Sequence, residues 1–491
     1  MSYHARDCEL VLGLVSPVGV NHDDIEARLK DFLRQFNYEV NYIHLSETSK
    51  KYFPNWQREA IGEVQRLDFG METGTAIREH FDRGDIYALA AIAEINASRE
   101  LENNTRRPRP RTVHIIRSLK HADEVNTLRE VYGNGFFLLG ISSRNETRKD
   151  YLRNQKGVPE EQVGRLIERD DKEKRPLGQQ TRNVFQLADA FITTDDHERL
   201  SHQFTRILEL LFSNPHISPT EEEYAMFMAY AASLRSADLS RQVGAVIANK
   251  HGDIISTGAN DVPRFGGGLY WPTTAEHGIK DQRDYVWKKD MNEVERNRII
   301  DEVIDLTIGP DGEEDKKQLA RKKLEKSRIN DLTEFGRAVH AEMEALLQAS
   351  RTGIPVRESK LYTTTFPCHN CAKHIVAAGI QEVIYIEPYP KSYAINLHKD
   401  SIDNENTSSQ NKVNFRQFVG IGPRKFIDLF SMNLGNGRKV VRKENGVNYD
   451  WKRANSELRI PMSPLSYLDS EIAISTELQK MLEEELREDE K

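Results

Sequence analysis

The chain has 491 residues, of which 38% are hydrophobic and 30% are charged, and its formal net charge at pH 7 is −8. This composition is typical of a globular protein with two or three domains, and the longest apolar runs are too short to span a bilayer. The acidic balance disfavours a large nucleic-acid footprint. Only three cysteines are present and no signal-peptide pattern opens the sequence, so we expect a cytoplasmic protein without disulfides or membrane contacts.

The first 200 residues predict a parallel α/β sheet. Residues 9–16 form an apolar run typical of a buried strand, 23–36 carry apolar residues on one helical face, and 40–45 form a second strand. A strand, a glycine-containing loop, a helix and another strand are the opening of such a sheet. Further strands are predicted at 113–118, at 136–142 and at the end of a helix-to-strand pair over 186–194.

The loop after the first strand resembles a phosphate-binding loop in its position and glycine content. Gly13, Ser16 and Gly19 are its candidate nucleotide-binding residues. No lysine follows Gly19, and the next helix opens with Asp23-Asp24, which would repel phosphate. The loop is therefore either a degenerate nucleotide pocket or a turn kept for the fold alone. We expect weak or no nucleotide binding and no kinase catalysis.

A domain boundary is predicted at about residue 215. Ser218-Pro219-Thr220-Glu221 combines a helix N-cap, a first-turn proline and a capping-box glutamate. This signal divides the chain into domains 1–215 and 216–491. One helix is predicted over 75–97 in the first domain, and a hairpin around His251-Gly252 in the second.

Residues 265–334 form an insertion within the second domain. It contains aromatic residues and a charged segment, 315–326, that predicts a helix. Aromatics interleaved with lysines could stack on a nucleic acid, but a lid, an oligomer contact or a regulatory arm is an equal alternative. At the other end of the domain, the charged residues 477–491 predict a solvated terminal helix.

The densest chemistry lies between His340 and Cys371. His340-Ala341-Glu342 precedes a predicted helix, and Pro367-Cys368-His369-Asn370-Cys371 opens another. His340, Cys368 and Cys371 can hold one zinc ion and leave its fourth position for water, as catalytic zinc sites do. Glu342 is then the general acid and base that moves protons from that water. The alternative is a structural half-site or a redox pair of cysteines.

The spacing H-x-E…P-C-x-x-C resembles that of zinc-dependent nucleobase deaminases. The segments 240–246 (SRQVGAV) and 258–264 (GANDVPR) are similar to the pattern of deoxycytidylate deaminases. The segment 118–125 (SLKHADEV) and the pair Asp170-Asp171 resemble a longer form of that family, in which a P-loop nucleotide-kinase-like domain precedes the deaminase domain. The long form includes the bacterial anti-phage dCTP deaminases.

This resemblance implies two α/β domains: a degenerate P-loop kinase-like parallel sheet and a cytidine-deaminase-like α/β/α domain. It implies Zn²⁺-dependent conversion of dCTP or dCMP to the deoxyuridine nucleotide and ammonia, with Asn260 contacting the sugar-phosphate part. Asp261 stands where the family usually has glycine. The resemblance also implies a homo-oligomer, a regulatory nucleotide or inhibitory RNA, and an antiviral role through loss of dCTP.

Two other functions stay open on the residues alone. One is a deaminase that edits tRNA or single-stranded DNA, which the net acidic charge disfavours. The other is a nucleotide-binding regulatory protein or a phosphotransferase with a structural zinc site, which the absence of a loop lysine disfavours.

Overall fold

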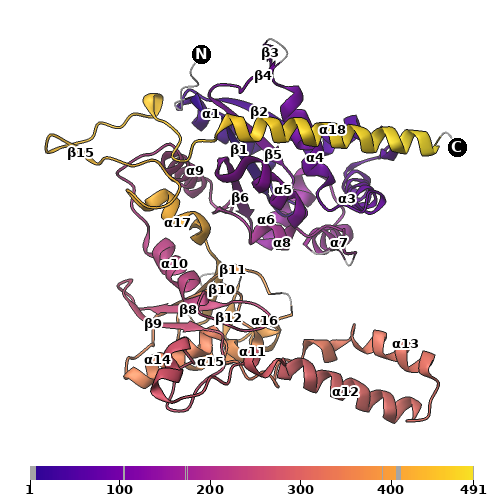
Figure 1. The fold of residues 1–491 in the computed structure, drawn as a ribbon, viewed down its shortest axis with the longest axis vertical. Coiled ribbons are helices and arrows are strands. Elements are labelled where there is room, and N and C mark those ends of the chain that lie inside the picture. The colour runs from indigo at the N-terminus through magenta and orange to yellow at the C-terminus, as the bar shows by residue number, and fades with distance from the viewer. Residues whose placement is uncertain are drawn as a thin grey trace. The chain divides into compact units, whose positions relative to one another are not determined.

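The structure is a computed structural model that describes residues 7–102, 105–171, 173, 175–389, 391–404 and 411–489. The chain divides into two compact units (Figure 1). Unit 1 combines the N-terminal part of the chain up to Glu223 with Val419 to the C-terminus, and unit 2 is Tyr224–Phe418. The predicted boundary at 215 lies near the first crossing, but the predicted domain 216–491 wrongly included the C-terminal segment. That segment packs on unit 1 because Ile421, Leu429 and Leu458 join its hydrophobic core.

A six-stranded sheet forms the centre of unit 1. Its order is β14-β7-β6-β1-β5-β2, and every pairing is parallel except that of the edge strand β14 with β7. The strands are β1 (Leu10–Val15), β2 (Glu39–His44), β5 (Thr112–Arg117), β6 (Phe136–Ser142), β7 (Ala190–Thr193) and β14 (Gly420–Ile421). Because β1 lies between β5 and β6, the loops that follow these three strands meet at one edge of the sheet.

Helices connect and cover this sheet. They are α1 (His22–Arg34), α2 (Leu45–Tyr52), α3 (Glu63–His80), α4 (Ile86–Ala97), α5 (Ala122–Tyr132), α6 (Asn145–Asp150), α7 (Glu160–Asp171), α8 (Thr181–Phe185) and α9 (His197–Leu211). The single helix predicted over 75–97 is wrong, because α3 and α4 are separate. Between them Asp82 has a φ of +49°, a left-handed conformation that a right-handed helix cannot continue through.

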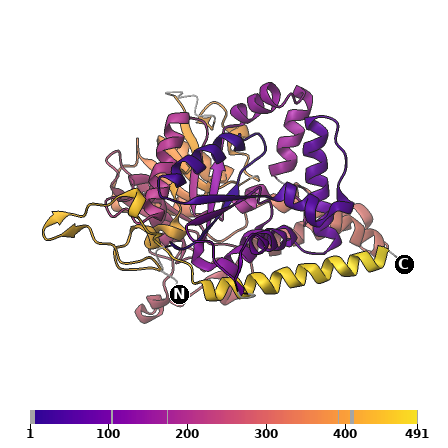
Figure 2. The ribbon, with the colours of Figure 1, turned by 90° about the horizontal axis from the view of Figure 1, so that it is seen from above.

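The C-terminal segment returns to unit 1 through α17 (Pro423–Phe430), the small hairpin β15 (Lys443–Glu444) and β16 (Val447–Asn448), and α18 (Pro464–Asp489). Figure 2 shows α18 running along one side of unit 1, where it packs against α4 and α5. The terminal helix therefore begins earlier than predicted, and its inner face is buried: Tyr467, Glu471 and Leu478 are at most 1% exposed.

Unit 2 is a second mixed sheet of order β12-β13-β11-β10-β8-β9. Strand β8 is antiparallel to β9 and β10, and the remaining pairs are parallel. The strands are β8 (Gly244–Ala248), β9 (Ile254–Ala259), β10 (Lys360–Thr365), β11 (Glu382–Glu387), β12 (Ile402–Asp403) and β13 (Val413–Gln417). The helices are α10 (Glu221–Ser233), whose first three residues belong to unit 1, α14 (Ala341–Thr352), α15 (His369–Ala377) and α16 (Ala394–Leu397). The predicted mixed α/β architecture is confirmed.

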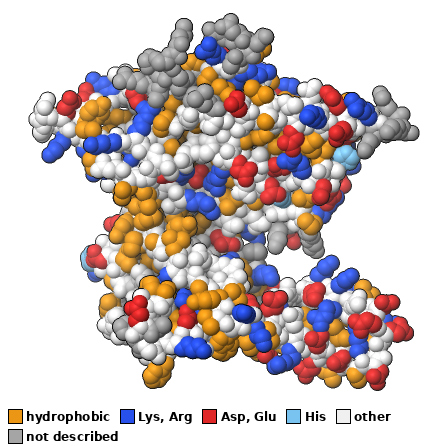
Figure 3. Space-filling view, in the orientation of Figure 1, with side chains coloured by type: hydrophobic (Ala, Val, Ile, Leu, Met, Phe, Trp, Pro, Cys, Tyr) orange, Lys and Arg blue, Asp and Glu red, His pale blue; other side chains and the backbone are white. Residues whose placement is uncertain are grey.

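The insertion 265–334 contains α11 (Asp284–Trp287), α12 (Met291–Ile308) and α13 (Glu314–Leu324), and α12 packs against α13 as a hairpin (Figure 1). Figure 3 shows acidic and basic side chains interspersed over this hairpin. The guanidinium groups of Arg235 and Arg337 lie 3.6 Å from the ring centroids of Trp271 and Trp287. Arginine therefore already covers one face of each tryptophan, which leaves less aromatic surface for stacking on bases.

Across the part of the chain that the structure describes, no helix is long and apolar enough to cross a membrane.

Candidate active site

Three candidate metal-binding side chains converge in unit 2. His340 is the N-cap residue of α14, Cys368 is the N-cap of α15, and Cys371 lies in the first turn of α15. The Nδ1 atom of His340 lies 3.3 Å from Cys368 Sγ and 3.4 Å from Cys371 Sγ. Their candidate ligand atoms all lie within 4.8 Å of one another, and no other such group occurs among the described residues. Cys8, the third cysteine, is buried in unit 1.

The spacing of these atoms fits a zinc ion. Zinc–nitrogen and zinc–sulfur distances of about 2.1 and 2.3 Å in a tetrahedral site place the nitrogen roughly 3.6 Å from each sulfur. The observed separations of 3.3 and 3.4 Å are close to this value. Three protein ligands also leave one position of a tetrahedral site for water, which is the arrangement of catalytic zinc sites rather than structural ones.

The three side chains shift one another's pKa values. For Cys368 the shift favours the thiolate, which is the form that binds a metal. Hydrogen bonds from Cys371 and His340 lower the pKa of the Cys368 thiol to about 4 although burial opposes this. The hydrogen bond to Cys368 raises the pKa of His340 to about 9, and a separate hydrogen bond to Cys368, together with burial, raises the pKa of Cys371. The backbone N–H of Cys371 also donates to Cys368 Sγ over 3.4 Å, which favours a thiolate at the start of α15.

Glu342 lies beside this group without belonging to it. It is in the first turn of α14 and is 4% exposed, with Oε2 3.5 Å from Cys371 Sγ. Burial raises the pKa of the Glu342 carboxyl, and the neighbouring His340 partly opposes that shift. A buried carboxyl of raised pKa beside an open metal position has the properties of a general acid and base.

A close contact between β9 and α14 fixes the position of His340 and Glu342. A Cβ atom at Gly258 would lie 2.0 Å from the carbonyl oxygen of Ala341 and 2.5 Å from the backbone nitrogen of Ala345. Glycine at this position therefore lets the first turn of α14 lie directly on β9. The sequence motif contained Gly258, but only the packing shows why it must be glycine.

Asn260 holds two backbone segments together next to the site. Its Oδ1 accepts a hydrogen bond from the Val243 N–H over 2.6 Å, and its Nδ2 donates to the Arg241 carbonyl over 2.8 Å. The following residue, Asp261, pairs through its backbone with Val339, the neighbour of His340. Asn260 thus has a structural role in the strand ends that carry the metal-binding histidine, in addition to the substrate contact predicted from the resemblance.

The side chain of Asp261 makes contacts that a glycine at this position could not make. It is 1% exposed, accepts from the Ala237 N–H over 3.3 Å, and forms an ion pair of 3.6 Å with Arg283 of the insertion. The departure from the family pattern therefore accompanies a contact that ties the insertion to the core of unit 2. Sequence reasoning had no signal for this pair, because Asp261 and Arg283 are far apart in the chain.

The predicted phosphate-loop residues lie in unit 1. Gly13 is inside β1, where a Cβ atom would lie 2.7 Å from Phe136 Cζ and 2.8 Å from Leu119 Cδ1, so side-chain packing explains this glycine. Ser16 Oγ is hydrogen-bonded to His22 Nε2 over 2.7 Å. Gly19 has a φ of +91° and packs against Arg148. The loop itself therefore begins at Ser16.

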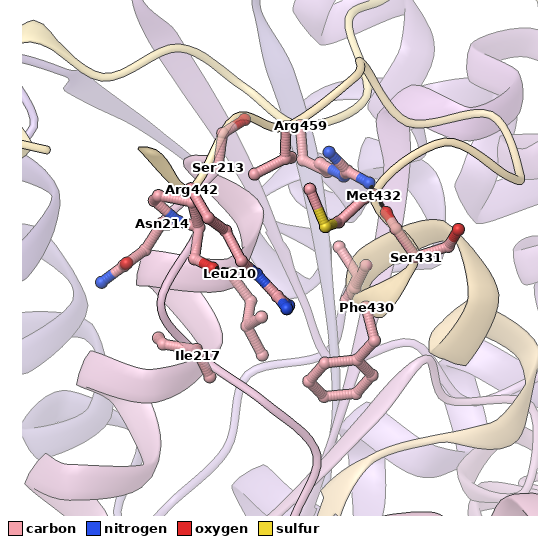
Figure 4. Close-up of a pocket in the computed structure, with 12 residues that line it drawn as sticks. Leu210, Ser213, Asn214, Ile217, Phe430, Ser431, Met432, Arg442 and Arg459 are labelled. Carbon is pink, nitrogen blue, oxygen red and sulfur yellow. Dashed lines mark hydrogen bonds between the residues drawn. The ribbon is translucent and has the colours of Figure 1, made fainter. Parts of the chain in front are cut away.

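A pocket in unit 1 is lined by the end of α9, the loop that follows it, and the C-terminal segment including α17 (Figure 4). The guanidinium of Arg459 donates to the carbonyl oxygens of Asp428, Ser431 and Arg438, and Arg442 Nε donates to the Pro215 carbonyl over 2.9 Å. These arginines anchor the returning chain, so we assign no chemistry to this pocket.

Comparison with known proteins agrees with this site. Residues 219–387 match the family profile described as the cytidine and deoxycytidylate deaminase zinc-binding region. The deoxycytidylate deaminase of enterobacteria phage T4 is 32% identical over 165 residues, which are 34% of this chain and 77% of that protein. That of phage T2 is 30% identical over 196 residues, 39% of this chain and 95% of that protein.

A third similarity is shorter. ComE operon protein 2 of Bacillus subtilis (strain 168) is 47% identical over 53 residues, so the match spans 11% of this chain and only 28% of that protein. The two phage proteins match over most of their length at 30% identity or more. On that basis, the chain belongs to the cytidine and deoxycytidylate deaminase family.

Proposed function

We propose that the protein is a hydrolase that deaminates a deoxycytidine nucleotide to the deoxyuridine nucleotide and ammonia. The observation that carries this proposal is the convergence of half-buried His340 with buried Cys368 and Cys371, and the carboxyl of Glu342 beside them. The deoxycytidylate deaminases of phages T4 and T2 support the choice of a deoxycytidine nucleotide as substrate.

The four site residues have two different roles in the addition of water and the release of ammonia. His340, Cys368 and Cys371 would hold Zn²⁺, which when bound lowers the pKa of a water molecule at its open position and so supplies a nucleophile at neutral pH. Glu342 would take a proton from the water as its oxygen adds to C4 and would give that proton to N3 of the cytosine ring. Glu342 would then take the remaining proton of the C4 hydroxyl and deliver it to the amine as the C4–N bond breaks. Water and the amino group thus become a C4 carbonyl and ammonia.

The finer proposals rest on the resemblance of the whole chain to the long deaminases. The substrate is dCTP, dCMP or both, and the enzyme removes dCTP during phage replication. Unit 1 is a degenerate P-loop kinase-like domain that senses a nucleotide or an inhibitory RNA and restrains the deaminase, and the protein forms a homo-oligomer. Nucleotide pools, measured in infected cells with the wild-type or an inactive chain, test the antiviral role: only the wild type should deplete dCTP.

The reaction is tested by ammonia release from zinc-loaded protein offered dCTP, dCMP, CTP, CMP and a cytosine-containing oligonucleotide separately. We expect turnover of dCTP or dCMP. Turnover of the oligonucleotide alone would replace the proposal with polynucleotide editing. The arginine-covered tryptophans of the insertion and the net charge of −8 argue against that outcome.

Glu342→Gln is the decisive variant. General acid–base catalysis contributes about 100-fold or more, so ammonia release should fall by at least that factor. Zinc content, measured by elemental analysis, should stay at the wild-type level because Glu342 is not a ligand. Cys368→Ser is the matched comparison, since it should lose zinc and activity together. Loss of zinc in Glu342→Gln would contradict the role assigned to this residue.

A further inference from the structure

A lysine from another loop lies on the degenerate phosphate loop of unit 1. Lys120 follows β5, and its Nζ donates to the Ser16 carbonyl over 2.9 Å. It therefore supplies an ammonium group to the loop after β1, although no lysine follows Gly19 in the sequence. The loops after adjacent strands of a parallel sheet meet at one edge, which is why residues about 100 positions apart can do this.

A carboxylate of the protein already occupies the point where the donors of this edge converge. Asp170, the penultimate residue of α7, accepts hydrogen bonds from the backbone N–H of Val18 over 2.7 Å, from Lys120 Nζ over 2.6 Å and from Thr181 Oγ1 over 3.2 Å. Its side chain is 1% exposed. A loop N–H, an ammonium group and a hydroxyl are the donors that phosphate sites use, and here they bind an internal anion.

The surroundings of Asp170 are positive. Arg148 is 4% exposed; its Nε donates to the Val18 carbonyl over 2.8 Å, and its Nη2 lies 3.5 Å from Asp171. That Nη2 atom is buried and makes no hydrogen bond. The pKa of His22, the first residue of α1 after this loop, falls to about 3 because of burial and the charges of Arg117 and Lys120. A buried guanidinium nitrogen without a hydrogen bond is the second sign that this edge can accommodate an anion.

We infer that the backbone N–H of Val18, Lys120 and Thr181 form a binding site for a phosphoryl group, and that Asp170 occupies this site in the absence of ligand. The ligand class is a polyphosphate, free or as part of a nucleotide. A bound phosphoryl group displaces Asp170 and frees the end of α7. This inference rests on the nucleotide site proposed for unit 1 and is independent of the deamination chemistry in unit 2.

An internal carboxylate at this site is a physical reason for the weak nucleotide binding expected of the loop. A ligand must compete with a carboxylate that is already hydrogen-bonded and covalently tethered at the site. Each charge-assisted hydrogen bond contributes enough to change affinity by about tenfold or more, so removal of the internal competitor should be visible in binding.

Isothermal titration of the full-length protein with inorganic pyrophosphate tests the site. We expect Asp170→Asn and Asp170→Ser to bind pyrophosphate about tenfold or more tightly than the wild type. Glu168→Gln is the matched control, because it removes an exposed carboxylate from the same helix, α7. It should stay within about twofold of the wild type. In the double variant Asp170→Ser/Lys120→Met, the affinity for pyrophosphate should not exceed that of the wild type.

Equal affinity of the wild type and both Asp170 variants would overturn the inference that Asp170 occupies the site. Absence of binding by all of them would overturn the site itself, while ammonia release by the wild type would still stand as a separate result. If an Asp170 variant is too unstable for titration, its unfolding temperature with and without pyrophosphate gives the same answer, since a ligand raises the stability of the state it binds. Replacing pyrophosphate with ATP shows whether a nucleoside adds affinity to the shared phosphoryl contact.

Discussion

The four residues of the zinc motif could be placed from the sequence because their geometry is local. His340 and Glu342 are two positions apart at the start of one helix, and Cys368 and Cys371 are three positions apart at the start of another. Helix geometry alone therefore brings the two members of each pair close together. Asn260 and Asp261 could not be placed in this way. Their partners are backbone groups and an arginine of the insertion, and such contacts leave no trace in residue spacing.

The structural role of Asn260 predicts what its removal does. In Asn260→Ala, the buried N–H of Val243 and the carbonyl of Arg241 lose their partners, so the free energy of unfolding should fall by about 1–3 kcal/mol. Asn249→Ala, which removes exposed hydrogen bonds in the turn at the opposite end of the β8–β9 hairpin, should cost less than about 0.5 kcal/mol. Chemical denaturation measures both. A rise in KM with unchanged stability would instead mean that Asn260 serves the substrate alone.

At the scale of elements, the contact between β9 and α14 predicts that a side chain at Gly258 would be destabilising. Alanine at Gly258 would place its Cβ against the Ala341 carbonyl and the Ala345 nitrogen, two backbone atoms of the first turn of α14. The helix start must move, and His340 and Glu342 move with it. We expect a loss of about 1–3 kcal/mol in stability and a deaminase rate lower by about 100-fold, because misplacement by about 1 Å has effects of that size.

Gly164→Ala is the control for Gly258→Ala. Gly164 lies in α7 with no atom within 4 Å of its would-be Cβ, so alanine should stabilise that helix by up to about 1 kcal/mol. Thermal unfolding and zinc content should be measured for both variants. Unchanged zinc content and activity in Gly258→Ala would show that the close contact does not position the site.

Helix α18 shows where element-level reasoning from sequence fails. Its charged end predicted a solvated helix, yet its first half carries Glu471 into a buried ion pair with Arg99. Arg99 also binds Glu9, and all three side chains are fully buried. From the local sequence, a glutamate is expected to be exposed because it is charged. The arginine that compensates the buried charge of Glu471 lies 372 positions away, so the local pattern cannot indicate this pairing.

This buried pair predicts an acid-sensitive contribution to stability. Burial opposes ionisation of Glu9, but the hydrogen bond to His114 and the charge of Arg99 lower its pKa to about 2 from an ordinary 4.5. A depressed carboxyl pKa stabilises the fold above the unfolded value and loses that effect as pH falls from about 4.5 towards 2. The stability difference between wild type and Glu9→Gln should therefore be of the order of 3 kcal/mol at pH 6 and shrink by pH 3.

Urea denaturation at pH 6, 4 and 3 measures that difference, with Glu59→Gln, an exposed position, as the control. Glu471 titrates in the opposite sense, because burial raises its pKa. Because the charge of Glu9 is one cause of that raised pKa, the comparison is repeated in a Glu471→Gln background, which isolates the contribution of Glu9. A difference that is constant across the three pH values would contradict the assignment.

At the scale of the whole molecule, unit 1 is built from two separate segments of the chain, and unit 2 is inserted between them. The fold class followed from alternating strand and helix patterns, but the return of residues after Val419 to unit 1 depends on tertiary packing alone. The helix start at Ser218 marked the first crossing between units because it is a local signal. Phe418 to Gly420 has no comparable signal, since the chain leaves unit 2 directly after β13 and pairs β14 with β7.

The discontinuous unit predicts which fragment of the chain can stand alone. A fragment of residues 224–418 contains the whole second sheet and the metal-binding residues, whereas 216–491 also carries α17 and α18 without the core they cover. We expect 224–418 to be monodisperse in size-exclusion chromatography and to hold about one zinc ion per chain. The fragment 216–491 should aggregate, because the apolar face of α18 that packs on α4 would be exposed to solvent. Monodisperse 216–491 together with aggregated 224–418 would show instead that the C-terminal segment completes the deaminase unit.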